Sequence, residues 1–393
     1  MNFLKPTPQR LKPHSPASAP LMVTAWYRYR QIIFAFTLGL TLLLGTYSRP
    51  ALAVPAKAQP FNSFADWCLH QNSLTPEAQR TVNLLLQVAD TRDCDRANQQ
   101  LSSLTEIFLN GVQLSDISPL ASLKNVKTLF LSNNPITDIS PLASLNNLTT
   151  LALSVNQIAD IRPLASLTQL NHLFLDSNQI ADISSLASLT QLATLSLFDN
   201  QIADISSLEP LTQLTNLSLS DNQITNISSL APLTQLTNLS LSDNQITEIR
   251  SLASLKQLTW LALGSNRISD ITPLNFLNQL TWLAIFDNQI SDLKPLASLA
   301  KLSKLSLGNN PITDISALQS LTNLTELLLF NNQISDISPL HSLTNLAWLD
   351  LYNNQISDIS PLQSLTNLTW LDLRNNPLTT KTCPVKSASV CRL

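Results

Sequence analysis

Charged residues are scarce in this sequence. Only 12% of its 393 residues are charged, and 23 Lys and Arg against 26 Asp and Glu leave a formal net charge of -3. A nucleic-acid-binding protein needs a basic patch that neutralises phosphates, and no basic run here provides one or holds the chain on a membrane surface. We therefore expect no nucleic-acid partner.

The sequence also lacks the motifs of common enzyme sites. It contains no phosphate-binding loop, no H-E-x-x-H and no G-x-S-x-G. Its four histidines (His14, His70, His172 and His341) are scattered and form no constellation. We therefore expect no catalytic residues, no metal and no other cofactor.

The amino-terminal segment indicates export. Arg28 and Arg30 precede an apolar run over 32–44, and an Ala-Leu-Ala site follows that ends at Ala53. This order predicts a secretory signal peptide that is cleaved after Ala53. The alternative is an uncleaved membrane anchor, although a run of about 13 residues is short of the roughly 20 that a spanning helix needs. Either Met1 or Met22 can be the start.

Cysteine is rare, and the four cysteines lie in two pairs on either side of residues 104–378: Cys68 with Cys94, and Cys383 with Cys391. Two such pairs beside an export signal predict two local disulfides. The alternatives are reduced thiols or a zinc site, but zinc sites have closer cysteine spacing or nearby histidines. A catalytic thiol at Cys68 or Cys94 is a further alternative, and no base is visible for it.

A 22-residue repeat fills the chain from Leu104 to Leu378. A clean copy begins at Leu148 and reads LTTLALSVNQIADIRPLASLTQ. Its first strand position recurs from Ile107 to Leu371 in twelve steps of 22 residues without a slip. A fixed period with the pattern L-x-x-L-x-L-x-x-N predicts a solenoid of leucine-rich repeats.

Each copy predicts one short strand followed by a buried asparagine. Leu151 and Leu153 point inward and Ala152 outward, because strand side chains alternate between faces. Asn156 recurs in eleven of the later and earlier coils, and Val112 replaces it in the first. An amide is both donor and acceptor, so we expect this column to bond the backbone groups that leave the strand.

The return side of each coil reads Asp-Ile-x-Pro-Leu in the clean copy. Pro is excluded from helix interiors and few residues remain, so we expect a 3₁₀ turn with the Asp capping it. The alternative is a column of carboxylates that binds Ca²⁺; Asn226 and Glu248 interrupt that column.

The segment before the repeats has a helical pattern. Thr75 is the expected N-cap with Pro76 at the first helical position and Glu77 in the first turn, and the apolar side is formed by Val82, Leu85, Leu86 and Val88. A solenoid needs an atypical segment over its first coil. The chain thus divides into a leader and signal peptide (1–53), a linker and helical cap (54–103), the leucine-rich repeats (104–378) and a carboxy-terminal cap (379–393).

The repeat, with Asn-x-Ile-x-Asp-Ile-x-Pro-Leu, resembles the 22-residue class of the bacterial internalins, which a regulatory subunit of eukaryotic protein phosphatase one shares. The resemblance covers Leu104 to Leu378. It implies an α/β fold: a right-handed solenoid with a parallel β-sheet on the concave face and 3₁₀ turns on the convex face. It also implies protein binding. The tail with Cys383 and Cys391 resembles a disulfide cap of exported bacterial repeat proteins.

Outward-facing strand positions have no packing role, so their content indicates where a partner binds. Aromatic residues gather there in the later coils, and such clusters are typical of interaction patches. The alternative is that stacked aromatics only stabilise neighbouring strands. The predicted partner-binding residues are Trp260, Trp282, Phe286, Phe330, Trp348, Asp350, Tyr352, Trp370, Asp372 and Arg374.

Together these patterns predict an exported binding scaffold that recognises a protein partner through its concave face. Recognition of carbohydrate or cell-envelope polysaccharide is one alternative, because Trp beside Asp and Asn suits a sugar. A structural, self-associating envelope protein is another. We expect a periplasmic, cell-surface or secreted location, with membrane contact only through an uncleaved signal segment.

Overall fold

The computed structural model describes residues 61–385 and 388–393. The predicted signal peptide and its cleavage site after Ala53 lie outside the described residues. Within them, three α-helices precede the repeats: α2 (Phe64–Leu69), α3 (Pro76–Val88) and α4 (Cys94–Ser103), with a short 3₁₀ turn η1 (Gln71–Ser73) between the first two. No helix of this described part is long and apolar enough to cross a membrane.

The cap helices begin where their sequences favour it. The Thr75 side chain accepts a hydrogen bond from the Ala78 N–H at 3.2 Å, with Pro76 at the first helical position, so the predicted N-cap is confirmed. Val82 and Leu85 are fully buried. The prediction for Val88 is wrong, because this side chain is 44% exposed. The next residue, Ala89, is the buried one, and successive residues of a helix point about 100° apart.

One parallel sheet of fourteen strands runs through the described residues, and its strands pair in sequence order. The strands are β1 (Glu106–Phe108), β2 (Thr128–Phe130), β3 (Thr150–Ala152), β4 (His172–Phe174), β5 (Thr194–Ser196), β6 (Asn216–Ser218), β7 (Asn238–Ser240), β8 (Trp260–Ala262), β9 (Trp282–Ala284), β10 (Lys304–Ser306), β11 (Glu326–Leu328), β12 (Trp348–Asp350), β13 (Trp370–Asp372) and β14 (Cys391–Arg392).

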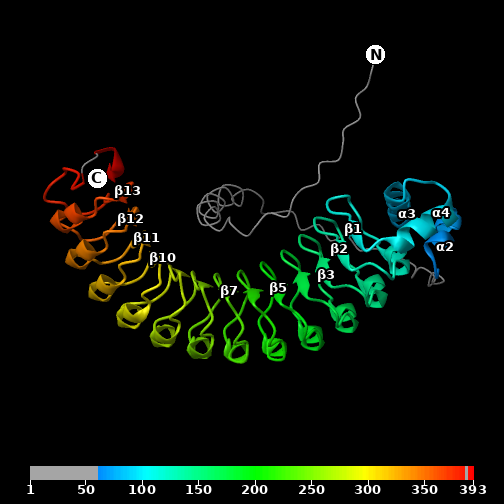
Figure 1. The fold of residues 1–393 in the computed structure, drawn as a ribbon, viewed down its shortest axis with the longest axis horizontal. Coiled ribbons are helices and arrows are strands. Elements are labelled where there is room, and N and C mark those ends of the chain that lie inside the picture. Colours follow the sequence, from blue (N-terminus) through cyan, green and yellow to red (C-terminus); the bar gives the residue numbers. More distant parts are fainter. Residues whose placement is uncertain (1–60, 386–387) are drawn as a thin grey trace, which may run out of the picture. The chain divides into compact units, whose positions relative to one another are not determined.

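A 3₁₀ turn forms the return side of each coil. These turns are η2 (Ser118–Ser122), η3 (Ser140–Ser144), η4 (Arg162–Ser166), η5 (Ser184–Ser188), η6 (Ser206–Leu208), η7 (Ser228–Leu230), η8 (Arg250–Ser254), η9 (Thr272–Phe276), η10 (Lys294–Ser298), η11 (Ser316–Ser320), η12 (Ser338–Ser342) and η13 (Ser360–Ser364), and η14 (Ala388–Val390) follows near the carboxy terminus. The stack of coils from β1 to β13 is curved, with the strands on the concave inner side and the 3₁₀ turns on the convex outer side (Figure 1). The predicted fold class is confirmed.

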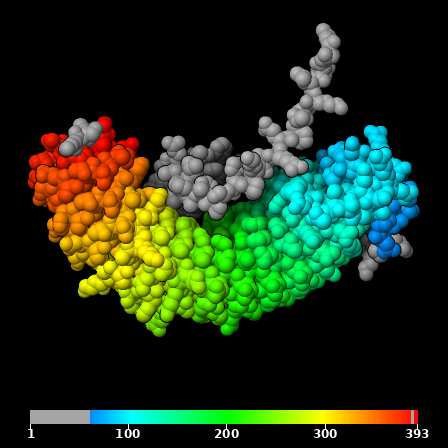
Figure 2. Space-filling model, in the orientation of Figure 1, coloured from blue at the N-terminus to red at the C-terminus, as the bar shows by residue number. Residues whose placement is uncertain are grey.

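The core is a stack of identical layers. From β1 to β13 each central residue pairs with its equivalent one repeat later, as Leu349 does with Leu371. The inward positions of the clean copy, Leu151, Leu153, Ile158 and Ile161, are at most 1% exposed. Because each coil buries its apolar side against the next, the coils pack side by side from the blue end to the red end (Figure 2).

The asparagine column bonds adjacent coils, as predicted. The Asn156 side-chain amide donates to the carbonyls of Leu131 at 3.1 Å and Leu153 at 2.8 Å, and its oxygen accepts from the Ile136 N–H at 3.1 Å. In the first coil the Val112 N–H donates to the Asn134 side chain. Every bond of this kind satisfies backbone groups that leave the sheet and have no ladder partner.

The acidic column on the return side caps the turns, as predicted. The Asp138 carboxylate accepts from the Ser140 N–H at 2.8 Å, and the amide oxygen of Asn226 accepts from the Ser228 N–H at 2.9 Å. An uncharged amide therefore performs the same function as a carboxylate. Among the described residues no three His, Cys, Asp or Glu side chains are grouped to hold a metal ion.

The cysteines form the two predicted disulfides, Cys68–Cys94 and Cys383–Cys391. The first joins α2 to the start of α4 in the cap. The second closes the segment that leads into β14, the strand that pairs with β13 at the end of the sheet. Both pairs are bonded, so neither a zinc site nor a free catalytic thiol exists at them.

Candidate recognition surface

The predicted partner-binding residues occupy three outward columns of the sheet in β8 to β13 and just beyond. One column lies immediately before the central leucine of each strand, one immediately after it, and one three residues after it. Trp260 and Trp282 stack in the first column, with ring centroids 4.4 Å apart and planes 7° apart. Trp348 and Trp370 stack in the same column at 4.2 Å and 13°. Strands in register place these indoles together.

An ion pair lies between the two tryptophan pairs. In the same column, Lys304 Nζ lies 2.9 Å from a carboxylate oxygen of Glu326, and their side chains are 34% and 30% exposed. We did not predict these two residues as part of the site. The repeat register could have found them, because 22-residue steps from Trp282 lead to Lys304, Glu326 and Trp348 in turn.

Two phenylalanines of the third column lie over glycines. A Cβ added to Gly264 would lie 2.5 Å from the ring of Phe286, and one added to Gly308 would lie 2.3 Å from the ring of Phe330. Each ring therefore fills the space that the glycine of the preceding coil leaves open. Both phenylalanines are only partly exposed, so they form the floor of the surface more than its edge.

At the end of the sheet, Asp372 is bound inside the surface. Its carboxylate is 2% exposed and accepts from Arg374 Nε at 2.9 and 3.1 Å and from the other guanidinium nitrogen. Arg374 also lies over the ring of Tyr352 at 5.6 Å. Arg392 of β14, which we did not predict, lies over the ring of Trp370 at 5.5 Å. The two arginines thus bind aromatic and acidic groups of their own chain.

Asp350 has a different environment from Asp372. Its carboxylate is half-buried and accepts from the Tyr352 N–H at 2.9 Å. The pKa of Asp350 is raised to about 6, chiefly by burial and also by the nearby Asp372. The hydrogen bond from the Tyr352 N–H and the charges of Arg374 and Arg392 lower this pKa and so limit the rise. Beside it on the same strand, Trp348 is 38% exposed. The structure therefore brings an exposed indole and a poorly solvated carboxylate together.

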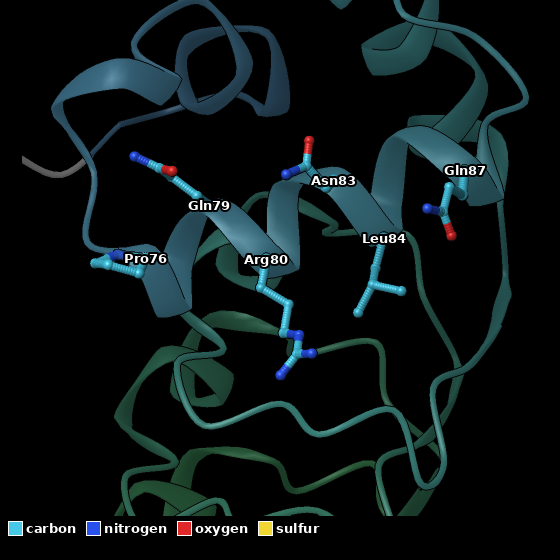
Figure 3. A pocket seen from close by; sticks show the side chains of 6 residues that line it. All are labelled: Pro76, Gln79, Arg80, Asn83, Leu84 and Gln87. Atoms are coloured by element: carbon cyan, nitrogen blue, oxygen red, sulfur yellow. The ribbon is translucent and has the colours of Figure 1, made fainter.

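A hollow on the outer side of α3 is chemically unlike this surface. Its wall is polar apart from Pro76 and Leu84, and the side chains extend from successive turns of one helix (Figure 3). Asn83 accepts from Gln71 at 2.7 Å and Arg80 donates to the Gln113 carbonyl at 3.3 Å. The first bond lies within the cap and the second attaches the cap to the first coil. None of the predicted site residues lies there.

Comparison with known proteins agrees with the repeat geometry. The family described as "Leucine Rich repeats (2 copies)" matches residues 102–144, 146–188, 190–232, 322–364 and 344–383, and the family described as "Leucine-rich repeat" matches residues 219–319. No curated protein matches the sequence. Fold and repeat together define a leucine-rich repeat protein.

Solved structures narrow the class. An internalin of Listeria monocytogenes, InlF, is 38% identical, with 79% of this chain and 92% of that chain covered and a TM-score of 0.75. The functional domain of InlJ from the same organism is 24% identical, with 80% and 76% covered and a TM-score of 0.59, which shows the fold alone. The chain belongs to the internalin-like leucine-rich repeat family.

Receptors share the same fold. The ectodomain of the plant receptor kinase GASSHO1/SCHENGEN3 from Arabidopsis thaliana, in complex with CASPARIAN STRIP INTEGRITY FACTOR 2, is 24% identical. The match covers 77% of this chain and 37% of that chain, with a TM-score of 0.62. At this identity the likeness shows only that the architecture is common to both.

Proposed function

We propose that the protein is an exported scaffold that binds a protein partner through the concave surface of β8 to β13. The observation that carries this proposal is the pair of stacked indoles at each end of the surface. Between the two pairs, the first column holds Lys304 and Glu326. The third column holds Phe286 and Phe330. Stable interfaces concentrate their binding energy in Trp, Tyr and Arg residues. The predicted site residues supply all three types on one face.

The charged groups beside the indoles favour a protein over a sugar. The ion pair of Lys304 with Glu326 lies between the two stacked tryptophan pairs, and that of Arg374 with Asp372 lies beside the second pair. Charged side chains at an interface select a partner with complementary charges. The resemblance to InlF supports the repeat architecture on which this surface is built.

Export is supported by the signal-peptide pattern that ends at Ala53 and by two disulfides, which persist in oxidising compartments. Mass spectrometry of the mature chain tests this directly. We expect the measured mass to be that of a chain that begins at Val54. Before reduction this mass should be lower by four hydrogens than after reduction, because two disulfides are intact. A chain that retains residues 1–53, or one with four free thiols, contradicts export.

Partner capture with matched variants tests the binding role. The full chain, immobilised, is compared with Trp348→Ala/Trp370→Ala and with the control Phe108→Ala/Phe130→Ala, which removes a second aromatic pair at the other end of the sheet. We expect the tryptophan variant to lose the partner and the phenylalanine variant to keep it, with unchanged circular dichroism in both. Equal capture by all three proteins contradicts the proposal.

A further inference from the structure

At β13, near the end of the sheet, two arginines of the chain bind an indole and a carboxylate of that strand. Arg374 binds the carboxylate of Asp372 with two nitrogens, and Arg392 lies over the face of Trp370. An indole and a carboxylate on the same strand, two residues apart, therefore bind guanidinium groups here. Guanidinium groups favour carboxylates for their matching fork geometry and aromatic faces for the ring quadrupole.

One coil earlier the same indole and carboxylate recur without the arginines. Trp348 and Asp350 pair in register with Trp370 and Asp372. In this earlier coil, Tyr352 occupies the position of Arg374. Asp372 pairs with Arg392 on the following strand, whereas Asp350 pairs with Asp372. Among the described residues, the four ion pairs do not include Asp350, and its carboxylate accepts the Tyr352 N–H.

The exposed face of Trp348 lies on the side of the strand away from Arg392, while Arg374 lies over the ring of Tyr352, two residues beyond Asp350. Trp370 covers the face of Trp348 on the β13 side, so the other face looks toward β11, where Glu326 pairs with Lys304. Arg392 lies on the far side, at β14. Trp348 is 38% exposed, so an incoming group can reach it.

In the described part of the chain, none of the charged groups around Asp350 forms an ion pair with it. Those nearby are Asp372 on β13, Arg374 after it, Arg392 on β14 and Glu326 on β11. Arg374 is bound by Asp372, and Lys304 is bound by Glu326. A half-buried carboxylate gains more from a cation than a solvated one, because water screens it less.

We propose that Trp348 and Asp350 form a subsite for a cationic side chain, an arginine or a lysine, on the docking segment of the protein partner. The subsite rests on the proposed function and specifies its chemistry. The incoming cation takes at Trp348 and Asp350 the place that Arg392 and Arg374 take at Trp370 and Asp372. The partner segment therefore carries a positive charge where it crosses β12.

The test uses the full chain and two tripeptides, acetyl-Gly-Arg-Gly-amide and its citrulline counterpart, which has nearly the same shape without the charge. Binding is followed by NMR of the indole N–H of Trp348, assigned with a Trp348→Phe variant. We expect the arginine peptide to shift this signal saturably with a dissociation constant of about 1 mM, since a single side chain makes few contacts. We expect the citrulline peptide to leave it unchanged.

Two Asp→Asn variants separate binding from structure. Asp350→Asn keeps the acceptor for the Tyr352 N–H and removes the charge, and we expect it to weaken the arginine peptide at least about tenfold. Asp358→Asn removes a charge on the return side, where Asn226 shows that an amide caps the turn equally well. We expect this control to bind as the unmodified protein does, and both variants to keep their circular dichroism.

Acidification gives an independent readout. Because the pKa of Asp350 is about 6, we expect arginine-peptide binding to weaken as the pH falls through 6, and the Asp350→Asn variant to show no such change. Equal binding of the citrulline peptide, or full binding by Asp350→Asn, overturns the subsite. If the partner is then still lost with Trp348→Ala/Trp370→Ala, the proposed function stands alone. If the Trp348→Ala/Trp370→Ala variant keeps the partner while the unmodified protein binds the arginine peptide, the proposed function fails. The site at Trp348 and Asp350 then binds a guanidinium group but does not serve the partner.

Discussion

The coils of β6 and β7 and those of β8 to β13 share one backbone but present different chemistry on the same concave face. In the middle coils the outward side chains are small and polar, and they bond to one another. The Asn216 amide donates to Thr215, Thr237 donates to Asn238, and the hydroxyls of Ser220 and Ser240 lie 2.6 Å apart. In the later coils the outward side chains are indoles, phenyl rings and ion pairs.

The interior of the two regions is the same. Leu239 and Leu349 are both fully buried, and Asn244 and Asn354 make the same set of hydrogen bonds to carbonyls. The core packing and the hydrogen bonds of the fold therefore form in the same way under small polar side chains and under aromatic ones. Packing of the core does not require four outward tryptophans, which is why we propose that they recognise a partner.

Converting the aromatic region to the polar one should have the largest effect. We expect replacement of Trp260, Trp282, Trp348 and Trp370 by Asn, the residue of β6 and β7, to weaken partner binding at least about 100-fold, since hot-spot residues contribute 2 kcal/mol or more each. The melting temperature should change little. Surface plasmon resonance with the captured partner measures the change, and retained affinity would move recognition away from this face.

The hydrogen bonds of the asparagine column should contribute more to the free energy of unfolding in the middle of the solenoid than at its end. Asn244 is 9% exposed with buried hydrogen bonds, whereas the bonds of Asn376 are part-buried. We expect Asn244→Ala to lower the free energy of unfolding by about 2–3 kcal/mol and Asn376→Ala by about 1 kcal/mol, because water replaces lost partners at the end. Urea unfolding measures both. An equal loss would refute this difference between the middle and the end.

Asp350→Asn should stabilise the aromatic region. The pKa of Asp350 is about 6, above its ordinary 3.8, so the folded protein holds the proton more tightly than the unfolded chain. The ionised carboxylate therefore destabilises the fold above pH 6, and this cost disappears as the pH falls toward 3.8. We expect the variant to gain about 2 kcal/mol at about pH 7.5 and nothing at about pH 3.5. Thermal unfolding at both pH values measures this, and a loss at about pH 7.5 would contradict it.

The smallest effect concerns the turn that follows each strand, which has a left-handed backbone in the early coils as well as in the later ones. Val155 has φ 58°, and the equivalent Asn309 has φ 55°. A β-branched side chain disfavours this conformation and Asn tolerates it. We expect Val155→Asn to raise the free energy of unfolding by about 1 kcal/mol and the reverse change Asn309→Val to lower it similarly. Chemical denaturation of the two variants checks the pair.

Much of this molecule could be predicted from its sequence because the repeat never slips. Each strand, each asparagine and each capping Asp follows from its position in the 22-residue period, and the two disulfides follow from how the cysteines flank the repeats. Val88 was misassigned because helix periodicity near a helix end leaves neighbouring residues ambiguous. Partner, export and the role of each site residue stay predictions, because they depend on molecules other than this chain.

The sequence alone determined the solenoid, because a strict period allows one register in which every leucine reaches the core. It also determined which columns point outward. Only the tertiary structure decided how the outward residues meet: Arg392 reaches Trp370 across a strand that the repeat pattern does not include, and Phe286 lies over a glycine 22 residues earlier. The difference in burial between Asp350 and Asp372 also depends on neighbouring strands, because Asp350 pairs with Asp372 of β13 whereas Asp372 pairs with Arg392 of β14.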